Sequence, residues 1–224
     1  MNLERIIDFH SHILPGVDHG SDSVEISLKQ LEYAEKHGVE RVVFTSHFYP
    51  DRTTADSFIY RRDKAYERLL SAYSGALKFS LGAEVLVCGG LERLEGLERL
   101  CISGTRTLLL ELPLGASKPM HAKTISALIE KGFRVVLAHI DRYDRALIDT
   151  YLELGCLAQL NADGALKPFV ASRYKRLACK GKLVAIGSDI HGDNEKAYIR
   201  YAKALKKLGN EAEHILSATA DLIK

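Results

Sequence analysis

The chain alternates short, strongly apolar segments with longer amphipathic ones, and this alternation limits the fold more than any other feature. The apolar segments predict seven strands, at residues 5–9, 41–46, 78–84, 107–112, 134–139, 156–161 and 183–189. Several of them, such as TLLLEL and RVVLAH, are nearly continuous in Val, Leu and Ile, which is typical of parallel strands buried on both faces. The pattern therefore predicts repeated βα units.

Amphipathic segments between these strands predict helices at about 23–37, 55–73, 117–131, 144–154, 167–180, 194–208 and 211–222. There is no low-complexity linker, so residues 1–224 are expected to form a single domain. Seven parallel strands without a dinucleotide-type glycine motif favour a closed or nearly closed (β/α)7 TIM-like barrel, with an open doubly wound sheet as the alternative. A barrel carries its chemistry at the carboxyl ends of the strands.

The bulk composition excludes several classes of function. The net charge of +2 gives no reason to expect nucleic acid or an anionic membrane as a partner. The longest apolar runs are too short to cross a bilayer, so no membrane insertion is expected. The start MNLER leads directly into a strand, without a signal peptide, and we expect a cytoplasmic protein.

The four cysteines do not form a recognisable motif. Cys88, Cys101, Cys156 and Cys179 are scattered without C-x-x-C spacing, which favours reduced thiols over a disulfide framework. A phosphatase nucleophile of the C-x5-R type is also disfavoured, because CISGTR places Arg106 one residue too close to Cys101. Buried, unreactive thiols are the expected alternative.

The ends of the predicted strands carry a second pattern. Six of the seven have side chains suited to metal binding: His10, His12, His47, Glu84, Glu111, His139, Asp189 and His191. Residues two apart in a strand point to the same face, so each of the pairs His10/His12 and Asp189/His191 can reach one ion. Strand six offers only Asn161, as a supporting group. Any one of these residues alone is better explained as a salt-bridged or structural group, but their shared position predicts a multinuclear site for manganese, iron or zinc.

The three remaining histidines apart from His19 are expected to be structural or at the surface. His37 lies at a helix carboxyl end, His121 at a helix start and His214 in the last helix.

The ordered set H-x-H, H, E, E, H, D-x-H resembles the polymerase-and-histidinol-phosphatase (PHP) superfamily. DFHSHILPGVDHG, LGAEV, LLLELP, LAHIDRY and IGSDIHG are similar to its bacterial capsule-biosynthesis protein-tyrosine phosphatases, the CpsB/YwqE-like group, over about residues 6–200. The resemblance implies a distorted seven-stranded barrel with three divalent ions, with manganese expected and iron or zinc as alternatives. It groups the ligands as His10, His12, Glu84 and Asp189; as Glu84, Glu111 and His139; and as His19, His47 and His191.

This sequence departs from the family pattern in three places. VDHG stands where the family usually has Asp-Asp-Gly, so His19 is expected as the ligand and Asp18 as its supporting or alternate group. The family's HxER is HIDR here, which keeps Arg142 and replaces a glutamate by Asp141. An arginine expected after D-x-H is absent, and the nearest basic residue is Lys196, which offers a point charge and not a bidentate fork.

The resemblance implies a metal-dependent protein-tyrosine phosphatase that uses a metal-activated hydroxide, with Arg142 neutralising charge and Asp141 available as a proton donor. Its partner would be a phosphotyrosine-bearing protein, such as the tail of a bacterial tyrosine autokinase. Three alternatives stay open: a histidinol or other small-molecule phosphatase, a phosphodiesterase or exonuclease, and a metal-stabilised domain that only binds a partner.

Overall fold

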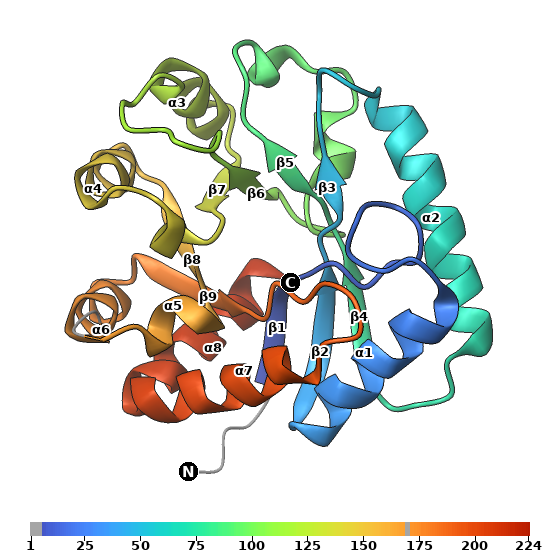
Figure 1. Cartoon of the computed structure of the whole chain (residues 1–224). Helices are drawn as coiled ribbons and strands as arrows, with labels where there is room; N and C mark the ends of the chain where they lie inside the picture. The colour runs from blue at the N-terminus through green and yellow to red at the C-terminus, as the bar shows by residue number, and fades with distance from the viewer. Residues whose placement is uncertain (1–5, 169–170) are drawn as a thin grey trace.

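Parallel strands form the centre of the molecule. The computed structural model describes residues 6–168 and 171–224, and within these residues nine strands form two sheets (Figure 1). The first sheet has the order β1-β2-β4 and contains β1 (Ile6–Ser11), β2 (Val39–Phe44) and β4 (Lys78–Leu81). The second has the order β3-β5-β6-β7-β8-β9 and contains β3 (His47–Phe48), β5 (Glu84–Leu86), β6 (Thr107–Glu111), β7 (Arg134–Leu137), β8 (Leu157–Asn161) and β9 (Leu183–Gly187).

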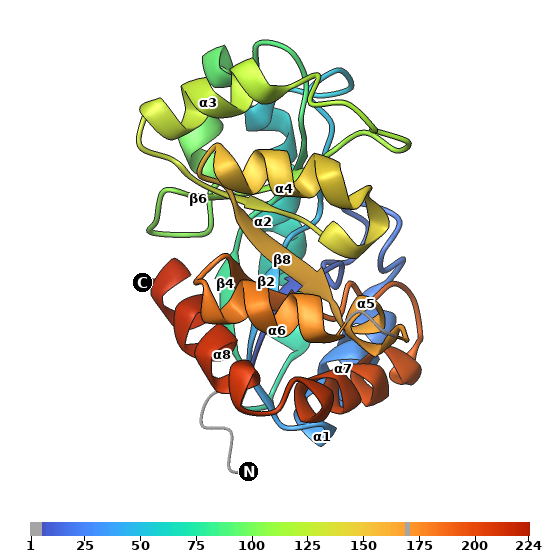
Figure 2. The same cartoon turned by 90° about the vertical axis from the view of Figure 1, so that its left-hand side faces the viewer.

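Helices surround these strands on the outside. They are α1 (Val24–Lys36), α2 (Ala55–Ala72), α3 (Ala122–Glu130), α4 (Arg145–Glu153), α5 (Ala162–Leu166), α6 (Ala171–Cys179), α7 (Glu195–Leu208) and α8 (Asn210–Leu222), with short 3₁₀ turns η1 (Leu91–Arg93), η2 (Leu97–Leu100) and η3 (Ile140–Arg142). In Figure 2, β8 passes behind an outer layer that contains α4, α6 and α8. Within the described residues, no helix combines the length and the hydrophobicity that crossing a bilayer requires.

The seven predicted strands and the helices between them are confirmed, with two additions. The predicted strands 41–46 and 78–84 are each broken in two, as β2/β3 and β4/β5, and α5 is a short helix that the sequence pattern did not predict. Arg5 of the first predicted strand and residues 169–170 of the predicted helix 167–180 lie outside the described residues.

The two breaks carry the chain from one sheet into the other. The Thr45 amide donates to the Ser11 carbonyl at 3.0 Å, and the Gly82 amide donates to Phe44 at 2.9 Å. Beyond the breaks, β3 and β5 pair with His47 opposite Glu84. The breaks therefore bring two predicted ligands side by side in one strand register.

Counting each broken strand once, the spatial order of the strands follows their order along the chain. A doubly wound sheet would reverse that order at a switch point, so the parallel α/β arrangement favours the barrel-like prediction. No ladder joins β9 to β1 among the described residues. Two backbone hydrogen bonds link these regions instead, from the Asp189 amide to the His10 carbonyl at 2.8 Å and from the His12 amide to the Ile190 carbonyl at 3.3 Å.

The space enclosed by the strands is apolar at its amino-terminal end. Phe9, Val43, Leu109 and Val136 are fully buried in one cluster, together with Leu222 from the last turn of α8. The Thr107 hydroxyl donates to the Leu222 carbonyl at 2.9 Å, which ties α8 to β6. Side-chain packing and α8 therefore fill this end of the barrel, and the polar strand ends lie at the other.

Candidate metal centre

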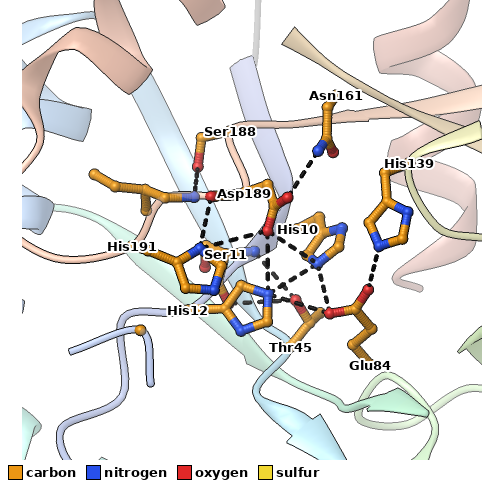
Figure 3. A network of polar contacts seen from close by, with 12 residues as sticks. His10, Ser11, His12, Thr45, Glu84, His139, Asn161, Ser188, Asp189 and His191 are labelled. Carbon is orange, nitrogen blue, oxygen red and sulfur yellow. Dashed lines mark hydrogen bonds and ion pairs between the residues drawn. The ribbon is translucent and has the colours of Figure 1, made fainter. Parts of the chain in front are cut away.

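The predicted strand-end ligands converge at the carboxyl ends of the strands, and Figure 3 shows this for His10, His12, Glu84, His139, Asp189 and His191. They come from β1 or the residue after it (His10, His12), from the first residues of β3 and β5 (His47, Glu84), from the end of β6 (Glu111) and from the segments after β7 and β9 (His139, Asp189, His191). These residues lie far apart in the sequence, from His10 to His191, and the parallel arrangement of the strands brings them together.

Glu84 lies at the centre of this group and is almost completely buried. Its Oε2 lies 3.2 Å from Nε2 of His10, 3.2 Å from Nε2 of His12 and 3.0 Å from Nδ1 of His47. Its Oε1 lies 2.7 Å from Nε2 of His139. One carboxylate therefore faces four imidazoles from three different strand regions.

Asp189 forms the second acidic focus. Its Oδ1 lies 3.3 Å from Nε2 of His12 and 3.7 Å from Nε2 of His10. Its Oδ2 accepts a hydrogen bond from the side-chain amide of Asn161 at 2.7 Å and also pairs with the Arg142 guanidinium. Asn161 therefore contacts a candidate ligand directly, and its supporting role stays a prediction.

Backbone strain is concentrated at this site. Among the described residues, the only non-glycine residues with positive φ are His139, at 33°, and Asp189, at 51°. Such conformations cost free energy for side chains with a Cβ, and they persist where surrounding contacts demand them. Here the left-handed turns point His139 and Asp189 into the cluster directly after their strands end.

Two buried residues that the sequence pattern did not single out hold the cluster in place. The Gln159 side-chain oxygen accepts from the His139 amide at 2.6 Å and lies 3.1 Å from Nδ1 of His10, which directs the other ring nitrogen of His10 toward Glu84. The Asp8 carboxylate accepts from the Ser188 amide at 2.8 Å and from the Tyr198 hydroxyl at 2.8 Å. The sequence contains one clue to each of them, because Gln159 lies two residues before the predicted Asn161 and Asp8 lies two residues before His10.

The loop after β1 places Asp18 and His19 differently. Both oxygens of Asp18 are engaged: Oδ2 lies 2.8 Å from Nδ1 of His12 and accepts from the His47 amide at 2.8 Å, and Oδ1 accepts from Gly20 at 2.9 Å. The His19 ring stacks on His47 with centroids 4.9 Å apart. This geometry suits Asp18 as the residue that orients His12, and it leaves His19 at the exposed edge, in ring contact with the cluster.

The other candidates lie around the cluster. Arg142 is half exposed at the rim. Asp141 faces away from the ligands. Its Oδ1 accepts from the backbone amide of Asn161 at 3.3 Å, and its Oδ2 lies 3.2 Å from Nζ of Lys167. Lys196 is exposed on α7 and has no recorded contact with any ligand among the described residues.

The electrostatics show which charges the site requires. Burial disfavours ionised Glu84 and Asp189, but the surrounding imidazoles outweigh it and hold the pKa of both carboxyls below their usual range. Burial likewise opposes charge on His139, yet Glu111 and Glu84 raise its pKa to about 9. Burial and the positive charge of His12 instead lower the pKa of His191 to about 4. The carboxylates stay ionised and need nearby positive charge.

The donor set fits divalent cations. Three groups have ligand atoms that all lie within 4.8 Å of one another: His12, His47 and His191; His10, His12 and Asp189; and His47, Glu84 and Glu111. Nδ1 of His47, Oε2 of Glu84 and Nε2 of His191 are buried without a hydrogen-bond partner. Unpartnered buried donors of this kind are costly unless an ion completes them.

These groups overlap with the ligand sets that the resemblance implied, without matching them member by member. His12 occurs in two groups, and His47 accompanies Glu84 and Glu111 where His139 was expected. Nε2 of His139 still lies 3.6 Å from Glu111. The division of ligands among individual ions therefore stays a prediction.

The cysteines are free thiols and lie outside this cluster. Burial raises the pKa of Cys101 and Cys156 to about 12, which disfavours the reactive thiolate form. His37, His121 and His214 also lie elsewhere, at the ends of α1 and α3 and within α8.

Curated tyrosine-protein phosphatases are similar to this chain in sequence. The tyrosine-protein phosphatase CpsB of Streptococcus pneumoniae is 29% identical over 220 residues, which cover 88% of this chain and 88% of that protein. The tyrosine-protein phosphatase YwqE of Bacillus subtilis is 24% identical over 235 residues, covering 97% and 91%.

Solved structures share the fold. One match comes from the crystal structures of YwqE from Bacillus subtilis and CpsB from Streptococcus pneumoniae, which are described as unique metal-dependent tyrosine phosphatases. Its TM-score is 0.78 at 22% identity, and the match covers 97% of this chain and 94% of the other. A histidinol phosphate phosphatase from Lactococcus lactis, complexed with zinc, L-histidinol and phosphate, matches with a TM-score of 0.57 at 14% identity over 92% and 94%.

The family model for capsular polysaccharide synthesis, CpsB/CapC, matches residues 6–220. This range contains all of the ligand candidates and nearly the whole fold. The chain therefore belongs to the CpsB/CapC family.

Proposed function

We propose that this chain is a metal-dependent protein-tyrosine phosphatase, with residues 1–224 as a single PHP-type domain. The observation that carries the proposal is Glu84, a buried carboxylate whose Oε2 makes no hydrogen bond and faces three imidazoles at 3.0–3.2 Å at the carboxyl ends of the strands. A site with this many convergent donors suits hydrolysis of a phosphate ester. The activity of the related CpsB and YwqE proteins supports phosphotyrosine as the substrate.

The residues that would hold the ions are His10, His12, His19, His47, Glu84, Glu111, His139, Asp189 and His191. We propose three ions, with manganese favoured, because nitrogen and carboxylate donors occur together in overlapping groups. When bound, divalent ions supply positive charge for phosphate oxygens and a water of lowered pKa as nucleophile.

The protein's own contribution is orientation. Asp18 holds His12 through Nδ1, so that Nε2 points at Glu84 and Asp189. Gln159 does the same for His10. Ligand orientation by such hydrogen bonds keeps the donors in place before an ion arrives, which lowers the cost of binding it.

Arg142 is the proposed phosphate-binding residue. Its guanidinium lies at the rim and pairs with Asp189, so it can exchange this partner for a phosphoryl oxygen while it stays beside the cluster. Asp141 is held by Lys167 and the Asn161 amide. That placement favours a role in positioning η3, and thereby Arg142, over direct proton donation. Phenolate is a good leaving group and needs little protonation.

We further propose a cytoplasmic enzyme whose substrate is a phosphotyrosine-bearing protein, such as the tail of a bacterial tyrosine autokinase. Membership of a family involved in capsular polysaccharide synthesis supports this assignment.

The test is hydrolysis of a phosphotyrosine peptide by the purified protein after chelation and re-addition of manganese, together with metal analysis. We expect turnover that requires the metal and a kcat/KM for the peptide well above that for histidinol phosphate. Preference for histidinol phosphate would assign the small-molecule alternative. Full metal occupancy without turnover of any phosphoester would contradict an enzymatic function.

A further inference from the structure

A cavity of about 270 Å³ opens beside the candidate metal centre. Two segments line it: the loop after β1, with Val17, Asp18 and His19, and the segment from β3 into α2, with His47, Tyr49, Arg52, Thr53 and Arg61. β3 and α2 lie on the same side of the molecule as that loop (Figure 1). His19 and His47 belong to both the cavity and the ligand cluster, so the cavity is continuous with the centre.

A column of stacked side chains connects the cavity with the candidate metal centre. The His47 ring stacks on His19 at 4.9 Å and on Tyr49 at 5.3 Å, with interplanar angles of 12° and 17°. The Arg52 guanidinium lies 4.7 Å from the centroid of the Tyr49 ring. The Arg52 amide also donates to the Tyr49 carbonyl at 3.0 Å, which closes the turn that holds this arrangement. The arginine is therefore held near the centre by stacking and by its backbone.

The charge of this cavity is uncompensated. Arg52 and Arg61 are both exposed, and neither has a recorded ion pair with any described residue. The one acid in the lining is Asp18, and both of its oxygens are already engaged by His12, Gly20 and His47. Two free guanidiniums beside an aromatic ring form a surface that favours carboxylate or phosphate groups.

We propose that this cavity, lined by Arg52, Arg61 and Tyr49, binds an anionic side chain that flanks the phosphotyrosine of the substrate. The inference rests on the proposed function and names its substrate class, an acidic or multiply phosphorylated peptide. The two steps from His47 to Tyr49 and from Tyr49 to Arg52 are 5.3 Å and 4.7 Å long. An extended peptide advances about 3.3 Å per residue, so a group within about three residues of the reacting tyrosine can span them. Aspartate or glutamate, or a second phosphotyrosine, supplies the required charge.

The test compares three peptides that differ only in the flanking positions: glutamine, glutamate or a second phosphotyrosine. With the full chain and manganese, kcat/KM is measured on each, and Kd is measured with a non-hydrolysable phosphotyrosine mimic in place of the reacting residue. We expect about a tenfold preference for the charged peptides over the glutamine peptide. In the double variant R52Q/R61Q, this ratio falls to within about twofold of unity.

Two controls keep the result specific. R200Q removes an exposed arginine on α7, where it pairs with Asp163, and should keep the full ratio. R52K/R61K keeps the charge but not the planar forks, and should show an intermediate ratio. A preference for only one charged peptide identifies the carboxylate or the phosphate as the ligand.

A double variant that retains the preference, or a wild-type chain that shows none for either charged peptide, would overturn the proposal. Hydrolysis of p-nitrophenyl phosphate separates this outcome from a failure of the proposed function, because that substrate has no flanking group. If it is not hydrolysed with manganese, the phosphatase assignment fails, and the Kd ratios alone decide whether the cavity binds anions.

Discussion

The two ends of the strand barrel are built from the same seven strand segments and have opposite chemistry. Toward the amino-terminal end, Ile7 of β1 and Val184 of β9 belong to one buried apolar cluster with Leu222 of α8. At the carboxyl end, the Glu84 carboxylate lies 3.2 Å from Nε2 of His10 and 2.7 Å from Nε2 of His139. A strand such as β1 contributes to both, since Ile7 and Phe9 enter the apolar cluster and His10 enters the polar one.

The comparison teaches that stability and function are separable along the length of a strand. The apolar end stabilises the fold by burying side chains, about 1.5–3 kcal/mol for each large one. The polar end lowers the stability of the fold, because buried carboxylates and the left-handed turns at His139 and Asp189 cost free energy. Substitutions at the two ends should therefore have different readouts, and four experiments examine this difference in order of expected effect.

The largest effect is expected for Glu84→Gln. The amide keeps the shape of Glu84 but removes the charge that faces the four imidazoles, so kcat for phosphotyrosine peptide should fall by about 10³-fold or more and metal content should drop. Steady-state kinetics and metal analysis measure both. Glu153→Gln, at the exposed end of α4, is the matched control and should change neither. Normal turnover in Glu84→Gln would remove Glu84 from the site.

At the opposite end, Leu222→Ala should destabilise the fold by about 2–5 kcal/mol, because Leu222 of α8 is buried in the interior cluster and is far along the chain from every candidate ligand. Urea denaturation measures the change. The folded fraction should keep its metal content and its KM. A loss of metal from folded Leu222→Ala protein would show that the two ends are coupled, which contradicts the separation described above.

Asp18→Asn should have a smaller effect at the polar end. The variant loses the charged acceptor that orients His12, and we expect metal affinity to fall by about 10–100-fold while the fold is retained. Competition with a chelator of known affinity gives the value. Asp22→Asn in the same loop is exposed and serves as the control. Equal affinity in Asp18→Asn and the unmodified chain would exclude an orienting role.

The smallest effect is a pH dependence of the metal-free protein. The pKa of His139 is raised to about 9, so its stabilising contribution is complete below its unfolded pKa, near 6.5, and is lost as the pH rises toward 9. The free energy of unfolding of chelated protein should therefore fall gradually across this window. Urea titrations at several pH values measure it.

Protein loaded with manganese should lack this decline, because the ion replaces the proton as the positive charge beside Glu84 and Glu111. Identical pH profiles with and without metal would show that the cation does not bind at His139.

Much of this architecture was predictable because it depends on local patterns. Continuous apolar runs marked the strands, and the residue directly after each run marked the site, since parallel strands end at the same face. His10, Glu111 and His139 were found in this way. Asp8 and Gln159 were missed, although each lies two residues before a predicted residue in the sequence, because this spacing alone does not distinguish a single acid or amide within an apolar run.

By itself, the sequence determined a set of elements: seven apolar strand segments, the helices between them and the types of ligand side chain at the strand ends. Only the tertiary structure decided that β2/β3 and β4/β5 are broken, that Glu84 lies at the centre of four imidazoles, and that Arg52 and Arg61 line one cavity with His47. The physical reason is range. Burial periodicity is a property of neighbouring residues, whereas strand breaks and side-chain convergence arise from contacts between segments far apart in the chain.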